Sequence, residues 1–266
     1  MPEVSLKDLV EAGAHFGHQS KRWNPKMAQY LYGVREGVHI FDLVKTKEKL
    51  DEVLDILKKA SKEGKTILFL GTKKQAKDKI VEVAKATNSF YVGERWLGGT
   101  LTNFDQIKSS IRKLSDMKTK MQKGEYSEYT KKERLLLERE IARLERFFGG
   151  LSGMDKYPDY MIVVDTKKEN GAIREAKDTG VEVIGIVDSN SDPTVVDYPV
   201  PMNDDATRAV SYVLDLFRDA ILEGRGVKTK PKSSKADKEA TKKVTKTKAK
   251  AAFKKTEAKK KATKVK

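Results

Sequence analysis

Short apolar runs alternate with longer amphipathic stretches along most of this chain, and no other feature of the sequence limits its fold as strongly. An apolar run at 66–70 precedes a stretch with Ala76, Ile80 and Ala84 at helical spacing, and a second apolar run follows at 90–92. Strands that alternate with helices in this way are typical of a parallel sheet that is covered by helices on both faces. We therefore predict an α/β fold with right-handed crossovers.

The second half of the chain repeats this pattern. The runs YMIVVD at 160–165 and VEVIGIVD at 181–188 are predicted strands, and a helix is predicted between them at about 169–178. A long final helix is predicted at about 204–223.

Three further elements are expected ahead of the first predicted strand. Ser5 and Asp8 have the spacing of a helix cap, so a short helix is predicted to begin there and to end near Gly13. The segments YLYG and VHIF indicate a small hairpin or two short strands. An amphipathic helix is predicted at about 46–63.

An insertion at about 102–148 departs from the alternating pattern and carries apolar residues at heptad spacing. A polar link at 124–129 divides it into two long charged stretches, so we expect an antiparallel coiled-coil hairpin. Thr130 and Glu133 form a capping-box sequence at the start of the second helix. The hairpin either binds partners or serves as a solvated stabilising arm. The residues expected in its seam are Phe104, Ile107, Ile111, Leu114, Met121, Leu137, Ile141, Leu144 and Phe148.

Most of the positive charge of the chain lies at its C-terminal end. The chain has 55 Lys and Arg residues against 39 Asp and Glu residues, a net charge of +16. Residues 225–266 contain 18 of the basic and three of the acidic residues, a net charge of +15, so residues 1–224 carry only +1. Because this Lys-rich segment has few apolar residues, we expect a disordered basic tail after one folded domain at 1–224. The tail either contacts polyanions or acts as a solubilising extension.

The stretch at 12–47 is the strongest candidate for a binding surface on the folded domain. It has no regular period over most of its length, and it holds six basic residues against two acidic ones. Phe16, Trp23, Tyr30 and Tyr32 alternate there with Lys, Arg and Asn side chains. Rings beside cationic and amide groups suit stacking on bases and pairing with phosphates, so this stretch is predicted to bind RNA.

Several classes of protein are excluded by composition. No apolar run approaches the length of a membrane span, so no membrane partner is expected. The start of the chain has neither a secretory signal nor the character of a transit peptide. The absence of Cys excludes disulfides and thiolate metal sites, and an intracellular protein is expected.

The motifs that resemble catalytic sequences fail on their spacing. GTKKQAKD at 71–78 follows a strand and opens a helix, but it lacks the second Gly and the Gly-Lys-Ser/Thr ending of a phosphate-binding loop. Lys73 and Lys74 could still hold an RNA phosphate at the helix N-terminus, or be solvated. No nucleophile or acid/base pair has a specific spacing, so no enzymatic activity is expected.

The sequence contains two weak candidates for a metal site. His15 and His18 lie three residues apart, but no further zinc ligands follow at convincing spacing. Asp188 ends a predicted strand and Asp205 lies at the start of the last predicted helix, and the two could share Mg²⁺. We favour the alternative, in which Asn203 or a neighbouring Asp caps that helix, and we expect no required cofactor.

Five motifs, in their order and spacing, resemble the bacterial form of the small-subunit ribosomal protein uS2 family. The resemblance covers about residues 4–223, and the predicted hairpin lies where that family has its insertion. The motifs are EAGAHFGHQSKRWNPKMAQYLYGVREGVHIFDLVKT, FLGTKKQAKD, ERWLGGTLTNF, FGGLSGMDKYPDYMIVVD and IVDSNSDPTVVDYPVPMNDDATRA.

The resemblance implies a flavodoxin-like body and a structural, noncatalytic role in the cytoplasmic small (30S) ribosomal subunit. It implies contact with 16S rRNA on the solvent side, between head and body, and with neighbouring proteins including bS1, which it helps to recruit. It does not imply a free homo-oligomer. The residues that it points to as rRNA-facing are Lys21, Arg22, Trp23, Asn24, Pro25, Lys26, Thr72, Lys73, Lys74, Arg95, Trp96, Thr100 and Asn103. The two Trp residues are equally open to a structural role.

Two other function classes stay open. A nucleotide-binding α/β enzyme is supported only by the sheet and the strand-end Asp residues, and ligand turnover would favour it. A histone-like nucleic-acid-binding protein is supported only by the tail, and it should lose its function when residues 225–266 are deleted.

Overall fold

The computed structural model of the protein describes residues 4–227. The predicted disordered tail beyond Val227 lies outside the described residues. In the described part of the chain, no helix has the length and apolar character needed to cross a membrane.

Five parallel strands form the main sheet, in the order β5-β4-β6-β7-β8. Numbered along the chain, this order is 2-1-3-4-5, which is the order of the sheet in flavodoxin, with a reversal between β4 and β6. The predicted parallel α/β sheet is therefore confirmed. The strands are β4 (Ile67–Leu70), β5 (Phe90–Val92), β6 (Tyr160–Val164), β7 (Glu182–Val187) and β8 (Tyr198–Pro201).

Strand β8 was not predicted, because its sequence YPVP contains two prolines. Proline cannot donate a ladder hydrogen bond, and within sheets it is confined mainly to edge strands. In the structure β8 pairs only with β7, so the prolines lie at the edge of the sheet.

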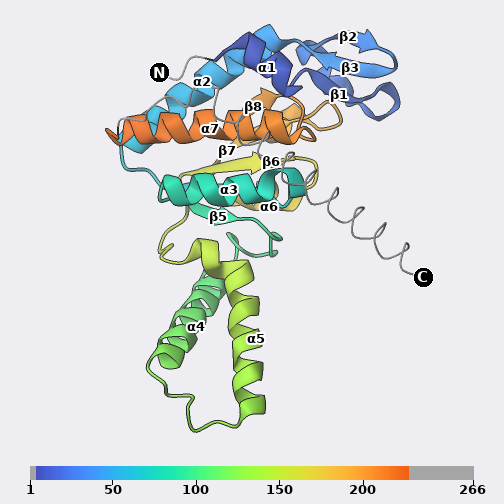
Figure 1. The fold of residues 1–266 in the computed structure, drawn as a ribbon. Coiled ribbons are helices and arrows are strands. Elements are labelled where there is room, and N and C mark those ends of the chain that lie inside the picture. The colour runs from blue at the N-terminus through green and yellow to red at the C-terminus, as the bar shows by residue number, and fades with distance from the viewer. Residues whose placement is uncertain (1–3, 228–266) are drawn as a thin grey trace, which may run out of the picture. The chain divides into compact units, whose positions relative to one another are not determined.

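Helices cover both faces of the sheet (Figure 1). Alternate residues of each strand point to opposite faces, so that Ile67 and Phe69 join one core while Leu68 and Leu70 join the other. The first core also contains residues of the helices α1 (Leu6–Ala12), α2 (Leu43–Lys62), α3 (Lys74–Ala86) and α7 (Thr207–Gly224). The second contains residues of α4 (Phe104–Gln122), α5 (Lys131–Phe148), η3 (Gly149–Leu151) and α6 (Asn170–Thr179).

The N-terminal part of the chain forms a short helix and a small antiparallel sheet. Ser5 caps α1 by accepting a hydrogen bond from the backbone N–H of Asp8 at 3.3 Å, and the helix ends at Gly13, as predicted. The sheet order is β1-β3-β2. The predicted pair of strands is thus confirmed, and β1 is an additional strand. The elements are β1 (Phe16–Gln19), β2 (Leu31–Arg35) and β3 (Val38–Phe41), with the short 3-10 helices η1 (Ser20–Arg22) and η2 (Pro25–Tyr30) between β1 and β2.

The insertion forms two helices, α4 and α5, that pack against each other (Figure 1). Ion pairs link them, with Lys113 Nζ 3.4 Å from Glu140 Oε1 and Lys118 Nζ 2.6 Å from Glu145 Oε1. The predicted capping box is present: the Thr130 hydroxyl accepts a bond from the backbone N–H of Glu133, whose carboxylate accepts one from the N–H of Thr130.

The prediction that Met121 lies in the hairpin seam is wrong. Met121 is 42 % exposed, whereas Met117, one turn earlier, is 9 % exposed and joins the core. Near the linker the two helices leave a hollow of about 210 Å³, which Met121, Tyr126 and Arg134 help to line. The seam therefore ends before the last turn of α4, where Met121 lines this hollow instead of joining the core.

Candidate nucleic-acid interface

The loop that follows β7 holds the predicted binding stretch in place. The Ser189 hydroxyl accepts a hydrogen bond from the backbone N–H of His18 at 2.7 Å, and the Ser189 carbonyl accepts one from Asn24 at 2.7 Å. A Cβ atom on Gly17 would lie 2.8 Å from the Ser189 hydroxyl oxygen, so only glycine allows this close approach. The main sheet and the small sheet are thus joined at the first motif.

Three residues of the first motif have very different surroundings. Lys21 and Arg22 are exposed on η1, and neither forms an ion pair with any residue in 4–227. Trp23 packs on the buried His39, with ring centroids 4.9 Å apart and planes tilted by 31°. Burial lowers the pKa of His39, so its imidazole is favoured in the neutral form under the indole.

Asn24 and Lys26 are used within the fold. The Asn24 side chain accepts a bond from the backbone N–H of Lys26 at 3.0 Å and so caps η2. The Lys26 ammonium donates to Asp192 at 2.6 Å and to the Thr194 hydroxyl at 3.1 Å. The Lys26 side chain therefore ties the first motif to the segment after β7, while the Asn24 side chain orders the motif itself.

The second motif surrounds a largely buried cation. The Lys73 ammonium lies 2.7 Å from Asp204, 2.6 Å from Asp205 and 3.7 Å from Asp165. Burial alone would lower the pKa of Lys73, but its bonds to Asp204 and Asp205 outweigh burial and raise it. Lys73 and Asp165 follow β4 and β6, so this cluster lies at the reversal of strand order, where α/β folds bind ligands. One cation here faces three carboxylates, and burial raises the pKa of Asp204 to about 7.

Thr72 and Lys74 lie on either side of that cation. The Thr72 hydroxyl donates to the Glu169 carboxylate at 2.5 Å, and Lys168 donates to the Thr72 carbonyl at 3.2 Å. Glu169 is 5 % exposed, and burial raises its pKa. Lys74, by contrast, is exposed at the first turn of α3 and forms no ion pair within the described residues.

The third motif forms a loop between β5 and α4. Trp96 is half-buried, and its indole N–H donates to Glu175 at 3.0 Å. Thr100 is 2 % exposed and its hydroxyl donates to the Leu97 carbonyl at 2.5 Å, so its side chain faces inward. Arg95 and Asn103, at the two ends of this loop, are exposed.

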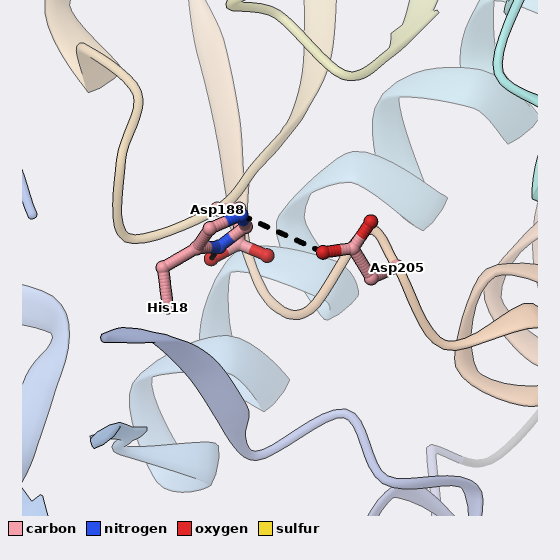
Figure 2. Close-up of side chains that lie close together, drawn as sticks. All are labelled: His18, Asp188 and Asp205. Atoms are coloured by element: carbon pink, nitrogen blue, oxygen red, sulfur yellow. Dashed lines mark ion pairs between the residues drawn. The ribbon is translucent and has the colours of Figure 1, made fainter. Parts of the chain in front are cut away.

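Sequence reasoning treated the histidines and the aspartates as separate metal candidates, whereas the structure joins His18 with Asp188 and Asp205 (Figure 2). His18 Nδ1 lies 3.0 Å from Asp188 Oδ1, and His18 Nε2 lies 3.5 Å from Asp205 Oδ2. The bond to Asp188 raises the pKa of His18. One nitrogen and two oxygen ligands could hold a divalent cation, and an imidazole ligand suits Zn²⁺ better than the predicted Mg²⁺.

The expected capping of the final helix is wrong in detail. Helix α7 begins at Thr207, and its N-cap Ala206 has no side-chain cap. Asn203 instead accepts bonds from the backbone N–H groups of Asp205 at 2.9 Å and Ala206 at 3.3 Å, which orders the turn ahead of the helix. Strand β8 occupies residues 198–201, so the chain needs this turn before α7 can start.

Several apolar side chains of the small sheet are exposed, which sequence reasoning missed. Phe16, Tyr32 and Val34 are 49 %, 83 % and 55 % exposed. They help to line a hollow of about 650 Å³, together with Val38 and Ile40. Tyr32 and Val34 are two residues apart on β2, and this alternation is the sequence signal that could have identified them as neighbours.

Comparison with known proteins decides the family. The family described as Ribosomal protein S2 matches residues 9–224. The chain belongs to this ribosomal protein family. It is 48 % identical over 225 residues to the small ribosomal subunit protein uS2 of Coprothermobacter proteolyticus, covering 85 % of this chain and 84 % of that protein. It is 46 % identical over 230 residues to uS2 of Dictyoglomus thermophilum, covering 86 % and 94 %.

Membership settles the general role of the chain. Ribosomal protein uS2 is a structural, non-enzymatic constituent of the small ribosomal subunit and acts in translation. The expectation from the five motifs is therefore confirmed at this level. The strand-end cluster at the reversal of sheet order is a set of internal ion pairs in a structural protein.

Proposed function

We propose that this protein binds 16S rRNA on the solvent side of the cytoplasmic 30S subunit, between head and body. The observation that carries the proposal is the exposure of cationic and amide side chains in three of the uS2 motifs. Among the cationic and amide residues expected to face rRNA, those exposed and without an ion pair in residues 4–227 are Lys21, Arg22, Lys74, Arg95 and Asn103. Solvated cations are the groups that neutralise phosphates, because they do not have to give up an internal partner.

Six other members of the expected set support this surface from within the fold. Lys26 and Lys73 pair with carboxylates, Thr72 bonds to Glu169, and Thr100 is buried. Asn24 and Trp96 also have internal bonds, which fits the structural role left open for Trp96. In this proposal they place the exposed residues rather than contact RNA themselves.

The proposal includes recruitment of bS1 and contact with other small-subunit proteins. Its support is the exposure of three apolar side chains of the small sheet, Phe16, Tyr32 and Val34, beside a hollow. Exposed aromatic and aliphatic side chains around a hollow are typical of protein–protein contacts. Residues 225–266 provide an additional nonspecific attraction to RNA in this proposal.

Cosedimentation of a truncated chain tests the proposal. A chain of residues 1–224 is expected to enter small ribosomal subunits, because the exposed cations of the three motifs all lie within it. The full-length chain serves as the matched control. Recovery of the truncated chain only in the ribosome-free fraction would contradict the proposal and favour the histone-like alternative.

A further inference from the structure

One carboxylate organises the loop of the third motif. Glu175 lies on α6, and its side chain accepts backbone N–H bonds from Gly99 at 2.9 Å, Leu101 at 3.0 Å and Thr102 at 3.4 Å. It also accepts the indole N–H of Trp96 at 3.0 Å. Hydrogen bonds to an ionised acceptor are stronger than neutral ones, so the conformation of this loop depends on a single side chain.

The Thr102 hydroxyl also donates to Glu175, at 3.4 Å, and within the described residues no hydrogen bond to any other residue ties the loop to the sheet layer. The remaining bonds of residues 95–103 run inside the loop, as from the Asn103 N–H to the Gly99 carbonyl at 2.9 Å, or into the start of α4. The buried Leu101 adds apolar packing, but packing is not directional. Glu175 therefore supplies the directional restraint on the path of the loop.

The ionised state of Glu175 agrees with this geometry. Burial opposes ionisation, but the N–H donors of Leu101, Trp96 and Gly99 outweigh it and lower the pKa of the carboxyl. The side chain is thus a carboxylate at neutral pH, with its lone pairs directed at the loop.

We propose that Glu175 is a positioning residue for rRNA binding, which holds the loop so that the exposed Arg95 and Asn103 at its ends meet the RNA. This inference rests on the proposed function. Glu175 is itself an anion and repels phosphate groups. Removing its charge should therefore strengthen RNA binding if only electrostatics matter, and weaken it if the loop position matters.

Binding of full-length variants to small ribosomal subunits from which this protein has been removed tests the proposal. We expect Glu175→Gln to bind about tenfold more weakly, because a glutamine has one acceptor oxygen and turns an NH₂ group toward N–H donors. The matched control is Asp178→Asn, which removes a charge from an exposed position of the same helix and should bind as the wild type does. Unchanged or tighter binding by Glu175→Gln would overturn the proposal.

A double-mutant cycle with Arg95→Gln separates positioning from a general loss of stability. If Glu175 acts through the ends of the loop, the double variant should lose less binding free energy than the sum of the losses of the two single variants. Fully additive losses, or an Arg95→Gln variant that binds as the wild type does, would overturn this inference alone. A wild-type chain that fails to bind would overturn the proposed function and the inference with it.

Glu175→Asp keeps the test decisive if Glu175→Gln does not fold. Aspartate retains the charge but is one methylene shorter, so it cannot reach all the donors of the loop. Binding between that of the wild type and a tenfold loss is expected, and wild-type affinity would overturn the proposal.

Discussion

Adjacent lysines of the second motif have opposite surroundings, which give them different roles in the proposed function. Lys73 is 15 % exposed and lies among Asp165, Asp204 and Asp205, whereas Lys74 points to solvent at the start of α3. A cation inside a carboxylate cluster stabilises the fold, since its removal leaves buried negative charges without a partner. A solvated cation contributes little to stability but is available to phosphate.

Substitution of each lysine by methionine should separate these roles. Lys73→Met is expected to lower the free energy of unfolding by about 3 kcal/mol, because Asp204 is left buried without its cation. Lys74→Met should change stability by less than about 0.5 kcal/mol while weakening association with small subunits. Urea unfolding at neutral pH measures the first effect. Equal stabilities of the two variants would contradict the assignment.

Glu169 should make stability depend on pH in a recognisable way. Burial raises the pKa of Glu169 in the folded state above its unfolded value. At pH values between these two pKa values, folding therefore takes up a proton, and the stability falls as the pH rises. The ionised carboxylate is then unfavourable at neutral pH. Glu169→Gln keeps an acceptor for the Thr72 hydroxyl and is expected to stabilise the protein by roughly 1 kcal/mol at pH 7.

Urea unfolding at pH 7 and at pH 4.5 would measure this dependence. The difference between Glu169→Gln and the wild type should shrink at the lower pH, where a larger fraction of the wild-type carboxyl is protonated. Glu138→Gln, at an exposed position of α5, is the matched control and should follow the wild type. A Glu169→Gln variant that is less stable at pH 7 would show that the carboxylate is needed in its charged form.

At the scale of elements, periodicity predicted which segments form helices and strands better than it predicted where each one ends. The heptad spacing of the hairpin identified most of its seam, but it placed Met121 rather than Met117 in the core. A seam extends only as far as the partner helix reaches, and the linker decides that reach. Strand β8 was missed for a related reason, because its prolines are tolerated only at a sheet edge.

Truncation of the two methionines should expose the true end of the seam. Met117→Ala is expected to destabilise the protein by about 2 kcal/mol, because it leaves a cavity between the hairpin helices. Met121→Ala should cost less than about 0.5 kcal/mol, because its side chain already contacts solvent. Thermal unfolding compares the two, and a larger loss for Met121→Ala would restore the heptad prediction.

At the scale of the whole molecule, the position of charge matters more than its total. Residues 1–224 are almost neutral, yet the stretch at 12–47 is basic and two of its cations, Lys21 and Arg22, are solvated. Lys26, another of its six cations, is paired with Asp192. The predicted RNA-binding surface is therefore narrower than the motif that contains it.

Reversing two charges should show this in the salt dependence of association. Lys21→Glu with Arg22→Glu is expected to weaken binding to small subunits and to reduce the slope of log affinity against log salt by about 1 to 2. The matched control, Lys59→Glu with Lys62→Glu, makes the same charge change at the exposed end of α2 and should leave the slope unchanged. Equal slopes for both variants would argue against phosphate contacts at Lys21 and Arg22.

The sequence by itself determined the α/β class, the inserted hairpin and the family, because these follow from local periodicity and from motifs in a fixed order. Only the tertiary structure decided which polar side chains meet. His18 joins Asp188 and Asp205, Lys73 joins three aspartates, and Glu175 joins the loop that follows Trp96. These partners lie 73 to 187 residues apart along the chain, so only folding brings them together.

The physical reason is the order of the parallel strands. Their carboxyl ends lie at one edge of the sheet, so residues that follow β4, β6 and β7 become neighbours there. Each of these side chains then loses water and must find a partner of opposite charge or a hydrogen bond. Spacing along the chain cannot reveal that partner, because it depends on which strands are adjacent.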